Sequence, residues 1–256
     1  MRFPMSSAIV PRFVAVEHTG STNADLRAHA AEVEEWPHLS TLVTRDQRAG
    51  RGRLDRTWIA PAGSALAVSV LLRTLPTESA ARGWIPLAAG AAMAEAITTQ
   101  LPGHDVAVKW PNDVLVDGRK ICGILAEATA DAVVVGAGVN TAMSREQLPL
   151  PTATSFAALG ADVDEDRLLS VYLRTLDEYL VALTASEDAV ASGLHGAVSA
   201  RCATLGQRVR VSLPAGATLE GTASAIDAEG RLLVEAEGRE HAVSAGDVVH
   251  VRPAGN

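Results

Sequence analysis

Cysteine is scarce in this chain of 256 residues, and that scarcity excludes two kinds of site. Only Cys122 and Cys202 are present. Their separation fits neither paired metal ligands nor the cysteine framework of a small secreted protein. The sequence therefore predicts no zinc or other metal site and no disulfide network, and we expect a reducing cytoplasm as the compartment.

Long apolar runs and an excess of basic charge are also missing. No uninterrupted apolar segment approaches the roughly 18 residues that a membrane-spanning helix requires. Residues 1–12 lack the charged, apolar and small-residue regions of a secretory signal. The formal net charge of −8 and the isoelectric point near 5.4 argue against general nucleic-acid binding. We therefore expect neither a membrane nor nucleic acid as a partner.

Three common catalytic machineries are absent as well. The sequence contains no GxxxxGK(S/T) phosphate loop and no GxSxG nucleophile elbow. Its seven histidines show no HExxH or other paired-ligand spacing. These absences exclude P-loop ATPases, α/β-hydrolases and zinc hydrolases.

The composition that is present suits one large domain followed by a small one. Hydrophobic residues make up 48% and charged residues 20% of the chain, enough apolar surface for a sizeable core. Hairpin signals mixed with helices favour an α+β fold for residues 1–204. After residue 205, short strands separated by turn residues predict a small β-barrel-like domain over 205–256.

Hydrophobic periodicity predicts the individual elements. Asp164 is expected to cap a long helix, and Asp117-Gly118 to turn a hairpin. Expected helices cover 24–35, 85–101, 165–184 and part of 190–202. Expected strands cover 13–17, 41–44, 65–72, 106–110, 114–116, 120–127 and 132–139, then 208–213, 218–226, 232–235 and 248–252, with turns at 214–216, 229–230 and 245–247.

A loop of alternating glycine and arginine, 50–53, is the most informative segment. Glycine allows close backbone approach, and arginine presents a fork of donors that suits carboxylate and phosphate oxygens. With Arg56 and Trp58 close behind, the loop is suited to wrapping a small anionic ligand; residues 54, 55 and 57 look like spacers. An arginine-rich solvated surface is the alternative.

Two further segments carry polar residues at strand ends. In 109–127 we expect Lys109 and Lys120 side by side on a two-stranded ribbon and Asn112 pointing into a cleft. Gly123 is expected to mark a close approach by a ligand or another backbone. A surface hairpin with exposed lysines is the alternative. In 133–140 the glycines precede Asn140, but Thr141 occupies the third position of a GxGxxG motif, which excludes a dinucleotide fingerprint. We expect instead a glycine-lined strand end that presents Asn140 to a ligand, and two packing glycines in a central strand are the alternative.

These segments in this order resemble the biotin–protein ligase family, also called biotin–[acetyl-CoA-carboxylase] ligase. The matching pieces are 20–23, Gln47 with 50–53 and Trp58, 109–113, 118–127 and 136–140. The likeness spans nearly the whole chain. It implies a catalytic domain like that of class II aminoacyl-tRNA synthetases, with a central mixed or antiparallel sheet flanked by helices, and a small C-terminal SH3-like β-barrel.

The resemblance also implies roles for individual residues. Lys120, Arg51 and Arg53 would be catalytic. The biotin site would comprise Ser21, Thr22, Asn23, Gln47, Gly50, Arg51, Gly52, Arg53, Lys120 and Gly123. The nucleotide site would comprise Arg53, Arg56, Trp58, Lys109, Asn112 and Asn140.

Activity and partners follow from the same resemblance. Family members use biotin, ATP and Mg²⁺ to make biotinoyl-5′-AMP and then biotinylate a lysine of a carrier domain of acetyl-CoA carboxylase or pyruvate carboxylase. About twenty residues precede Ser21, too few for the helix-turn-helix of family members that act as repressors, so we expect no DNA binding. A monomer or weak homodimer is expected. A lipoate or octanoate protein ligase or transferase, and a non-catalytic biotin-binding regulator, are the alternatives.

Overall fold

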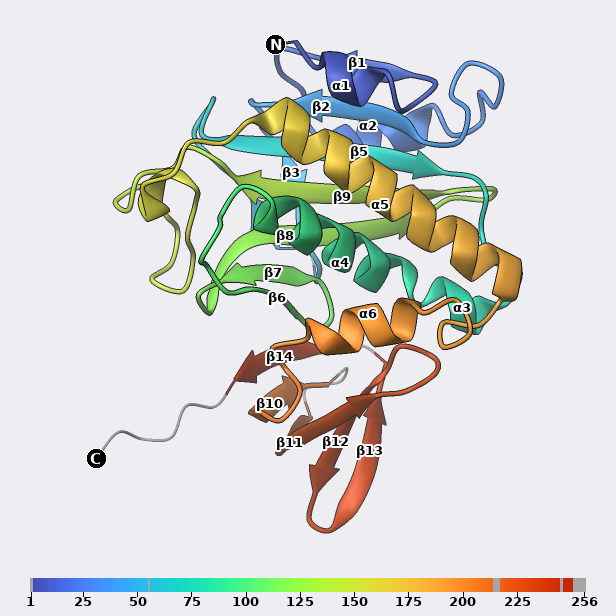
Figure 1. Cartoon of the computed structure of the whole chain (residues 1–256), viewed down its shortest axis with the longest axis vertical. Helices are drawn as coiled ribbons and strands as arrows, with labels where there is room; N and C mark the ends of the chain where they lie inside the picture. Colours follow the sequence, from blue (N-terminus) through green and yellow to red (C-terminus); the bar gives the residue numbers. More distant parts are fainter. Residues whose placement is uncertain (1, 55, 214–216, 245, 251–256) are drawn as a thin grey trace.

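The computed structural model describes residues 2–54, 56–213, 217–244 and 246–250. Its larger part is built on a seven-stranded sheet in the order β1-β2-β5-β9-β8-β7-β6 (Figure 1). β1 and β2 are parallel, and every other neighbouring pair is antiparallel. The strands are β1 (Phe13–Ala15), β2 (Ser40–Thr44), β5 (Ala65–Leu72), β6 (Val106–Lys109), β7 (Asp113–Val116), β8 (Arg119–Ala128) and β9 (Val133–Asn140). The expected α+β class with a mixed sheet is confirmed.

The centre of this sheet is formed by β5 and β9. Every residue of β5 is buried, as its run of apolar and β-branched side chains predicts. The antiparallel register places Ser69 of β5 opposite Gly136 of β9. The hairpin expected at Asp117-Gly118 joins β7 to β8, with φ of 49° and 72° at these two residues.

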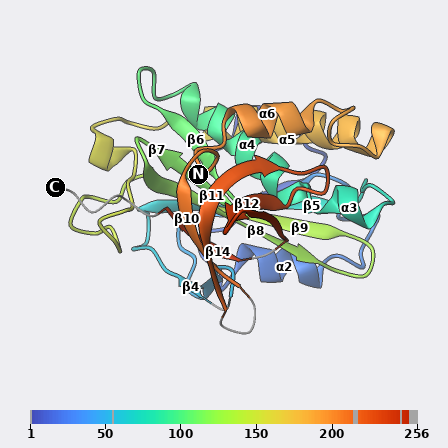
Figure 2. The ribbon, with the colours of Figure 1, turned by 90° about the horizontal axis from the view of Figure 1, so that it is seen from below.

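Helices cover both faces of the sheet. Figure 2 shows α4, α5 and α6 on one side of the strands and α2 on the other. The helical segments are α1 (Pro4–Ser7), α2 (Thr22–Ala28), α3 (Ser79–Arg82), α4 (Ile85–Thr98), the 3-10 turn η1 (Ala157–Leu159), α5 (Glu165–Ser186) and α6 (Leu194–Ala200). None of these described helices is both long and apolar enough to cross a bilayer.

The long helices follow the sequence patterns closely. Asp164 caps α5 by accepting a hydrogen bond from the Arg167 backbone N–H at 3.0 Å. In α4 nearly all residues are buried, because the helix packs against the sheet, α5 and α6. Small alanines make that close approach possible.

Two expected helices are shorter in the structure. The helix expected over 24–35 ends at Ala28, and the last expected helix forms only as α6. After α2 the chain turns, and Trp36 folds back onto Leu26 and Ala30 in a small apolar cluster. Val33, which lies within the range expected to be helical, is 55% exposed. Burial of Trp36 therefore outweighs continuation of the helix.

The C-terminal part is a five-stranded antiparallel SH3-like sheet in the order β13-β12-β11-β10-β14. Its strands are β10 (Arg208–Ser212), β11 (Thr218–Ile226), β12 (Leu232–Ala236), β13 (Arg239–Val243) and β14 (Asp247–His250). β13 was not expected from the sequence, because four of its five residues are exposed and give no apolar alternation. The expected turn at 214–216, part of the turn at 245–247, and residues 251–252 of the last expected strand lie outside the described residues.

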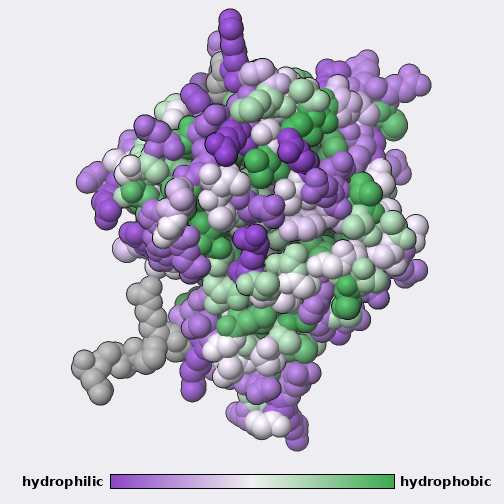
Figure 3. Space-filling view, viewed as in Figure 1, coloured by the Kyte–Doolittle hydropathy of each residue, from purple (hydrophilic) through white to green (hydrophobic). Residues whose placement is uncertain are grey.

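Two buried indoles join this sheet to the larger part. Trp84 Nε1 donates to the Ala228 carbonyl at 2.7 Å, and Trp110 Nε1 donates to the Gly230 carbonyl at 3.0 Å. Figure 3 shows hydrophobic residues gathered on the visible surface where the C-terminal sheet meets α6. The turn between β11 and β12 is thereby held against the region around Trp110, next to Asn112.

Candidate active site

A cavity of about 340 Å³ lies against the sheet, beside α2 and the glycine–arginine loop. That volume lies within the range of small-molecule sites. Thirteen of the fifteen residues expected at the site line it, and Gly50 and Lys109 do not. The thirteen are Ser21, Thr22, Asn23, Gln47, Arg51, Gly52, Arg53, Arg56, Trp58, Asn112, Lys120, Gly123 and Asn140. Residues that are far apart in the sequence are therefore brought to one place.

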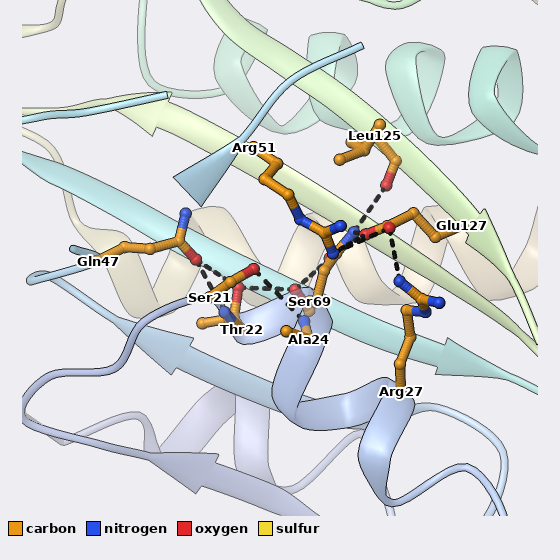
Figure 4. A network of polar contacts seen from close by, with 10 residues as sticks. Ser21, Thr22, Ala24, Arg27, Gln47, Arg51, Ser69, Leu125 and Glu127 are labelled. Carbon is orange, nitrogen blue, oxygen red and sulfur yellow. Dashed lines mark hydrogen bonds and ion pairs between the residues drawn. The ribbon is translucent and has the colours of Figure 1, made fainter. Parts of the chain in front are cut away.

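The start of α2 forms one wall of this cavity. Ser21 is the N-cap residue of the helix, and its Oγ accepts a hydrogen bond from the Ala24 backbone N–H at 3.4 Å. The backbone N–H and the hydroxyl of Thr22 both donate to Gln47 Oε1, at 2.8 and 3.0 Å (Figure 4). The orientation of the Gln47 amide is fixed by these two bonds.

Ser69 belongs to the same network, although the sequence analysis did not select it. Its Oγ lies 2.7 Å from Thr22 Oγ1 and 2.6 Å from Asn23 Oδ1, and the residue is fully buried. The sequence did contain a signal for Ser69, because it is a single serine inside the apolar run of β5 and a buried hydroxyl needs a hydrogen-bond partner. Ser69 thus connects β5 to the start of α2 by two hydrogen bonds.

The glycines of β9 make room for two large polar side chains. A Cβ atom at Gly136 would lie 2.3 Å from Asn23 Oδ1, and one at Gly138 would lie 2.6 Å from Trp58 Cε2. Asn23 and Trp58 therefore lie close to the backbone of β9, which a side chain at these two glycine positions would prevent. The expected glycine-lined strand is present, and the glycines accommodate residues of the site itself.

The glycine–arginine loop forms a short hairpin of its own. β3 (Gly50–Arg51) pairs with β4 (Thr57–Trp58), separately from the two larger sheets. A Cβ atom at Gly50 would lie 2.4 Å from Gln47 Nε2 and 2.5 Å from the Trp58 carbonyl oxygen. Gly50 thus allows the hairpin to pack closely without lining the cavity. Residue 55, expected to be a spacer, lies outside the described residues.

Lys120 projects from β8 beside Asp113 of β7. Its Nζ lies 2.6 Å from Asp113 Oδ1, and the lysine side chain is 43% exposed. At Gly123, where a ligand or another backbone was expected to approach, the neighbour is instead this lysine side chain: a Cβ atom there would lie 3.0 Å from Lys120 Nζ. The ammonium group is therefore positioned at the cavity by one carboxylate and one glycine.

The expected pairing of the two lysines on one ribbon is wrong. Lys109 lies on β6 and Lys120 on β8, with β7 between them. The local pattern identified strands but could not reveal which strand joins which. Burial, together with the nearby charge of Lys109, holds the pKa of His250 below its usual value. Lys109 therefore lies close to the C-terminal sheet.

The amides at the other end of the cavity are held by carbonyl groups. Asn112 Nδ2 donates to the Ile124 carbonyl at 2.8 Å, and its Oδ1 accepts from Arg53 Nη1 at 2.9 Å. Arg53 Nη2 also donates to the Gly246 carbonyl at 3.2 Å. Asn140 Nδ2 donates to the Thr154 carbonyl at 2.9 Å. The C-terminal sheet thus contacts the arginine loop directly.

Cys122 lies in the wall of the cavity, and burial raises the pKa of its thiol from 9.0 to about 12. The unfolded chain loses this proton above pH 9, whereas the folded chain keeps it until about pH 12. Stability should therefore be fully present below pH 9 and fall above it, by up to about 1.4 kcal/mol per pH unit. Urea unfolding at pH 8, 9 and 10 measures this slope. A Cys122→Ala variant with the same slope would contradict the assignment.

Comparisons with known proteins agree with this arrangement. The family described as Biotin/lipoate A/B protein ligase matches residues 16–140, and the biotin protein ligase C-terminal domain matches residues 204–251. A biotin–[acetyl-CoA-carboxylase] ligase of Mycobacterium tuberculosis is 41% identical over 93% of this chain and 88% of its own length. One of Paracoccus denitrificans is 30% identical over 90% of this chain and 97% of its own length.

The fold is also shared with solved structures. Biotin protein ligase from Aquifex aeolicus, in complex with biotin and ATP, superposes with a TM-score of 0.76 at 24% identity. The match covers 95% of this chain and 100% of that one. The sequence relatives carry the family assignment, and the shared fold is consistent with it. The chain belongs to the biotin protein ligase family.

Proposed function

We propose that this ATP-dependent biotin ligase carries out two half-reactions in the cavity described above. In the first, a biotin carboxylate oxygen attacks the α-phosphorus of ATP, and the bond to pyrophosphate breaks to give biotinoyl-5′-AMP. In the second, the deprotonated amine of an acceptor lysine attacks the acyl carbon, and AMP leaves as an amide bond forms. No covalent enzyme intermediate is required.

The observation that carries this proposal is the convergence of cations on one cavity. Arg51, Arg53, Arg56 and Lys120 all line it. A carboxylate must approach a polyanion in the first step, and two unit charges 4 Å apart repel by about 4 kcal/mol at an effective dielectric constant near 20. Guanidinium and ammonium groups at this junction offset that repulsion and stabilise the charge that develops during transfer.

The polar residues around these cations divide the cavity into two ends. We assign the biotin end to the α2 wall, where the hydrogen-bonded side chains of Ser21, Thr22, Asn23 and Gln47 face the cavity. We assign the nucleotide end to Trp58, Asn112 and Asn140. The indole supplies a flat apolar surface for a base, and the amides supply donors and acceptors. Lys120, between Asp113 and Gly123, would contact both substrates at the junction.

Mg²⁺ belongs to the proposal as the partner of the ATP phosphates. Across the described residues, no group of three or more His, Cys, Asp or Glu side chains is placed to hold a metal ion. Mg²⁺ commonly keeps several waters and binds through substrate phosphates with one or two carboxylates. Asp113, which lines the cavity, is the carboxylate placed to take part. The ion would neutralise phosphate charge during the first step.

The acceptor is proposed to be a biotin carrier domain of an acyl-CoA carboxylase, as the names of the relatives indicate for those proteins. We place the reaction in the cytoplasm, where ATP is available and cysteines remain reduced. Incubation of a carrier domain with the protein, biotin and MgATP should add one biotin to one lysine, measured by mass spectrometry. Modification with lipoate or octanoate in place of biotin would contradict the substrate assignment.

A second prediction concerns the mobility of the arginine loop. Because β3 and β4 form a small separate hairpin, we expect biotin and ATP together to protect Arg51, Arg53 and Arg56 from trypsin. Cleavage at Arg119, on the ordered hairpin of the central sheet, should change little and serves as the internal control. Equal rates of loop cleavage with and without ligands would show that the loop does not close over them.

A further inference from the structure

One carboxylate outside the cavity lining contacts both the α2 wall and the arginine loop. Glu127 Oε1 lies 2.9 Å from Arg27 Nη1 and 3.0 Å from Arg51 Nη2. Glu127 Oε2 accepts a hydrogen bond from Asn23 Nδ2 at 2.8 Å. A single side chain therefore connects two segments that are expected to hold biotin.

The backbone of Glu127 belongs to the central sheet. It lies on β8, where the antiparallel ladder pairs it with Val134 of β9. Arg51 lies on the β3–β4 hairpin, which shares no ladder with the seven-stranded sheet. The position of this hairpin relative to the sheet depends on side-chain contacts, including the one between Arg51 and Glu127. The Glu127 carboxylate therefore links the Arg51 guanidinium, on the separate hairpin, to the central sheet.

The charges in this cluster leave Arg51 able to attract an anion. One carboxylate faces two guanidinium groups, so the three side chains together keep a net positive charge. The Glu127 side chain is 17% exposed, whereas those of Arg27 and Arg51 are 40% and 47% exposed. Glu127 orients Arg51 without cancelling the charge of the cluster.

We propose that Glu127 is a positioning residue, which holds Arg51 over the biotin end of the cavity and orients the Asn23 amide. The inference rests on the function proposed above. A correctly placed Arg51 limits hydrolysis of the acyl-adenylate, in which water attacks the acyl carbon, the bond from that carbon to the phosphate oxygen breaks, and biotin and AMP leave. The residue would thereby couple biotin binding to retention of the intermediate.

The test is a Glu127→Gln substitution, which removes the charge and keeps the size. We expect the KM for biotin and the biotin-dependent release of AMP without acceptor to rise roughly 3- to 10-fold each, the effect of weakening partly buried ion pairs. Pyrophosphate exchange at saturating biotin should fall by a smaller factor than these, because Arg51, Arg53, Arg56 and Lys120 all remain in the cavity lining and only the orientation of Arg51 is weakened. A purely structural role would not separate these readouts.

Arg27→Gln is the matched control. It removes the other guanidinium from Glu127 but leaves the pair with Arg51, so AMP release should stay at the wild-type level. Equal AMP release from both variants would assign Glu127 to anchoring α2 and overturn the inference. If Glu127→Gln does not fold, Glu127→Asp keeps the charge on a shorter side chain and should raise AMP release by a smaller factor; unchanged release would overturn the inference.

The outcomes also separate this inference from the proposed function. Unchanged AMP release and KM in Glu127→Gln, with an active wild type, overturn the role of Glu127 alone. Absence of biotin-dependent AMP formation by the wild-type protein overturns the function on which that role rests.

Discussion

Replacing Lys120 with alanine should lower the rate of biotin-dependent pyrophosphate exchange by roughly 100- to 1000-fold, the usual effect of removing one donor that stabilises a transition state. The ammonium group lies at the cavity, 2.6 Å from Asp113 Oδ1. The loss should appear in kcat as well as in kcat/KM, because the ammonium group stabilises negative charge that develops in the transition state. Steady-state kinetics at saturating biotin and ATP measure it.

The fold should survive this change. A half-exposed lysine contributes little to stability, so the melting temperature should shift by only a few degrees. Arg119→Ala is the matched control, because it removes one positive charge from the neighbouring position of β8, outside the cavity lining. It should leave activity within about twofold. A folded Lys120→Ala protein with full activity would show that the assigned role of Lys120 is wrong.

The second large effect is expected from the glycines of β9. Gly136→Ala should raise the KM for biotin about tenfold or more, because the new methyl group would displace Asn23, which is held by Ser69 and Glu127. Gly138→Ala should instead raise the KM for ATP, because it would displace Trp58. The distinctive result would be that two alanine substitutions only two residues apart raise the KM of different substrates.

A glycine with open space around it provides the control for this pair. Gly196 lies in α6, and a Cβ atom there would meet nothing within 4 Å. Gly196→Ala should fold normally, keep both KM values, and gain slightly in stability, since alanine favours helix over glycine. If Gly136→Ala and Gly138→Ala raised the same KM, the division of the cavity into a biotin end and a nucleotide end would be contradicted.

The sequence anticipated the lining of the cavity where the lining residues lie within short motifs. The motifs around Ser21, Arg51, Asn112 and Asn140 carried the resemblance to the family, and the cavity contains all four residues. Ser69 and Glu127 were missed as members of the site for a common reason. Each acts through partners far away in the sequence, and the Asn23–Glu127 contact spans 104 positions. No local pattern encodes such a contact.

Strand order was the other limit of the sequence. The pattern identified β6, β7 and β8 as strands and placed a turn at Asp117-Gly118. It did not show that β7 separates Lys109 from Lys120, because hydrophobic alternation describes each strand by itself. The exposed strand β13 gave no such pattern at all.

The sequence by itself determined the cap of α5 at Asp164, the buried strand β5, the absence of a conventional phosphate loop, and the family. These depend on side-chain chemistry and periodicity within a few neighbouring residues. The tertiary structure alone decided that Trp36 ends the extension of α2, that the glycines of β9 make room for Asn23 and Trp58, and that Glu127 joins Arg27 to Arg51. Those outcomes depend on close packing and charge pairing between distant segments, which form only when the sheet has assembled.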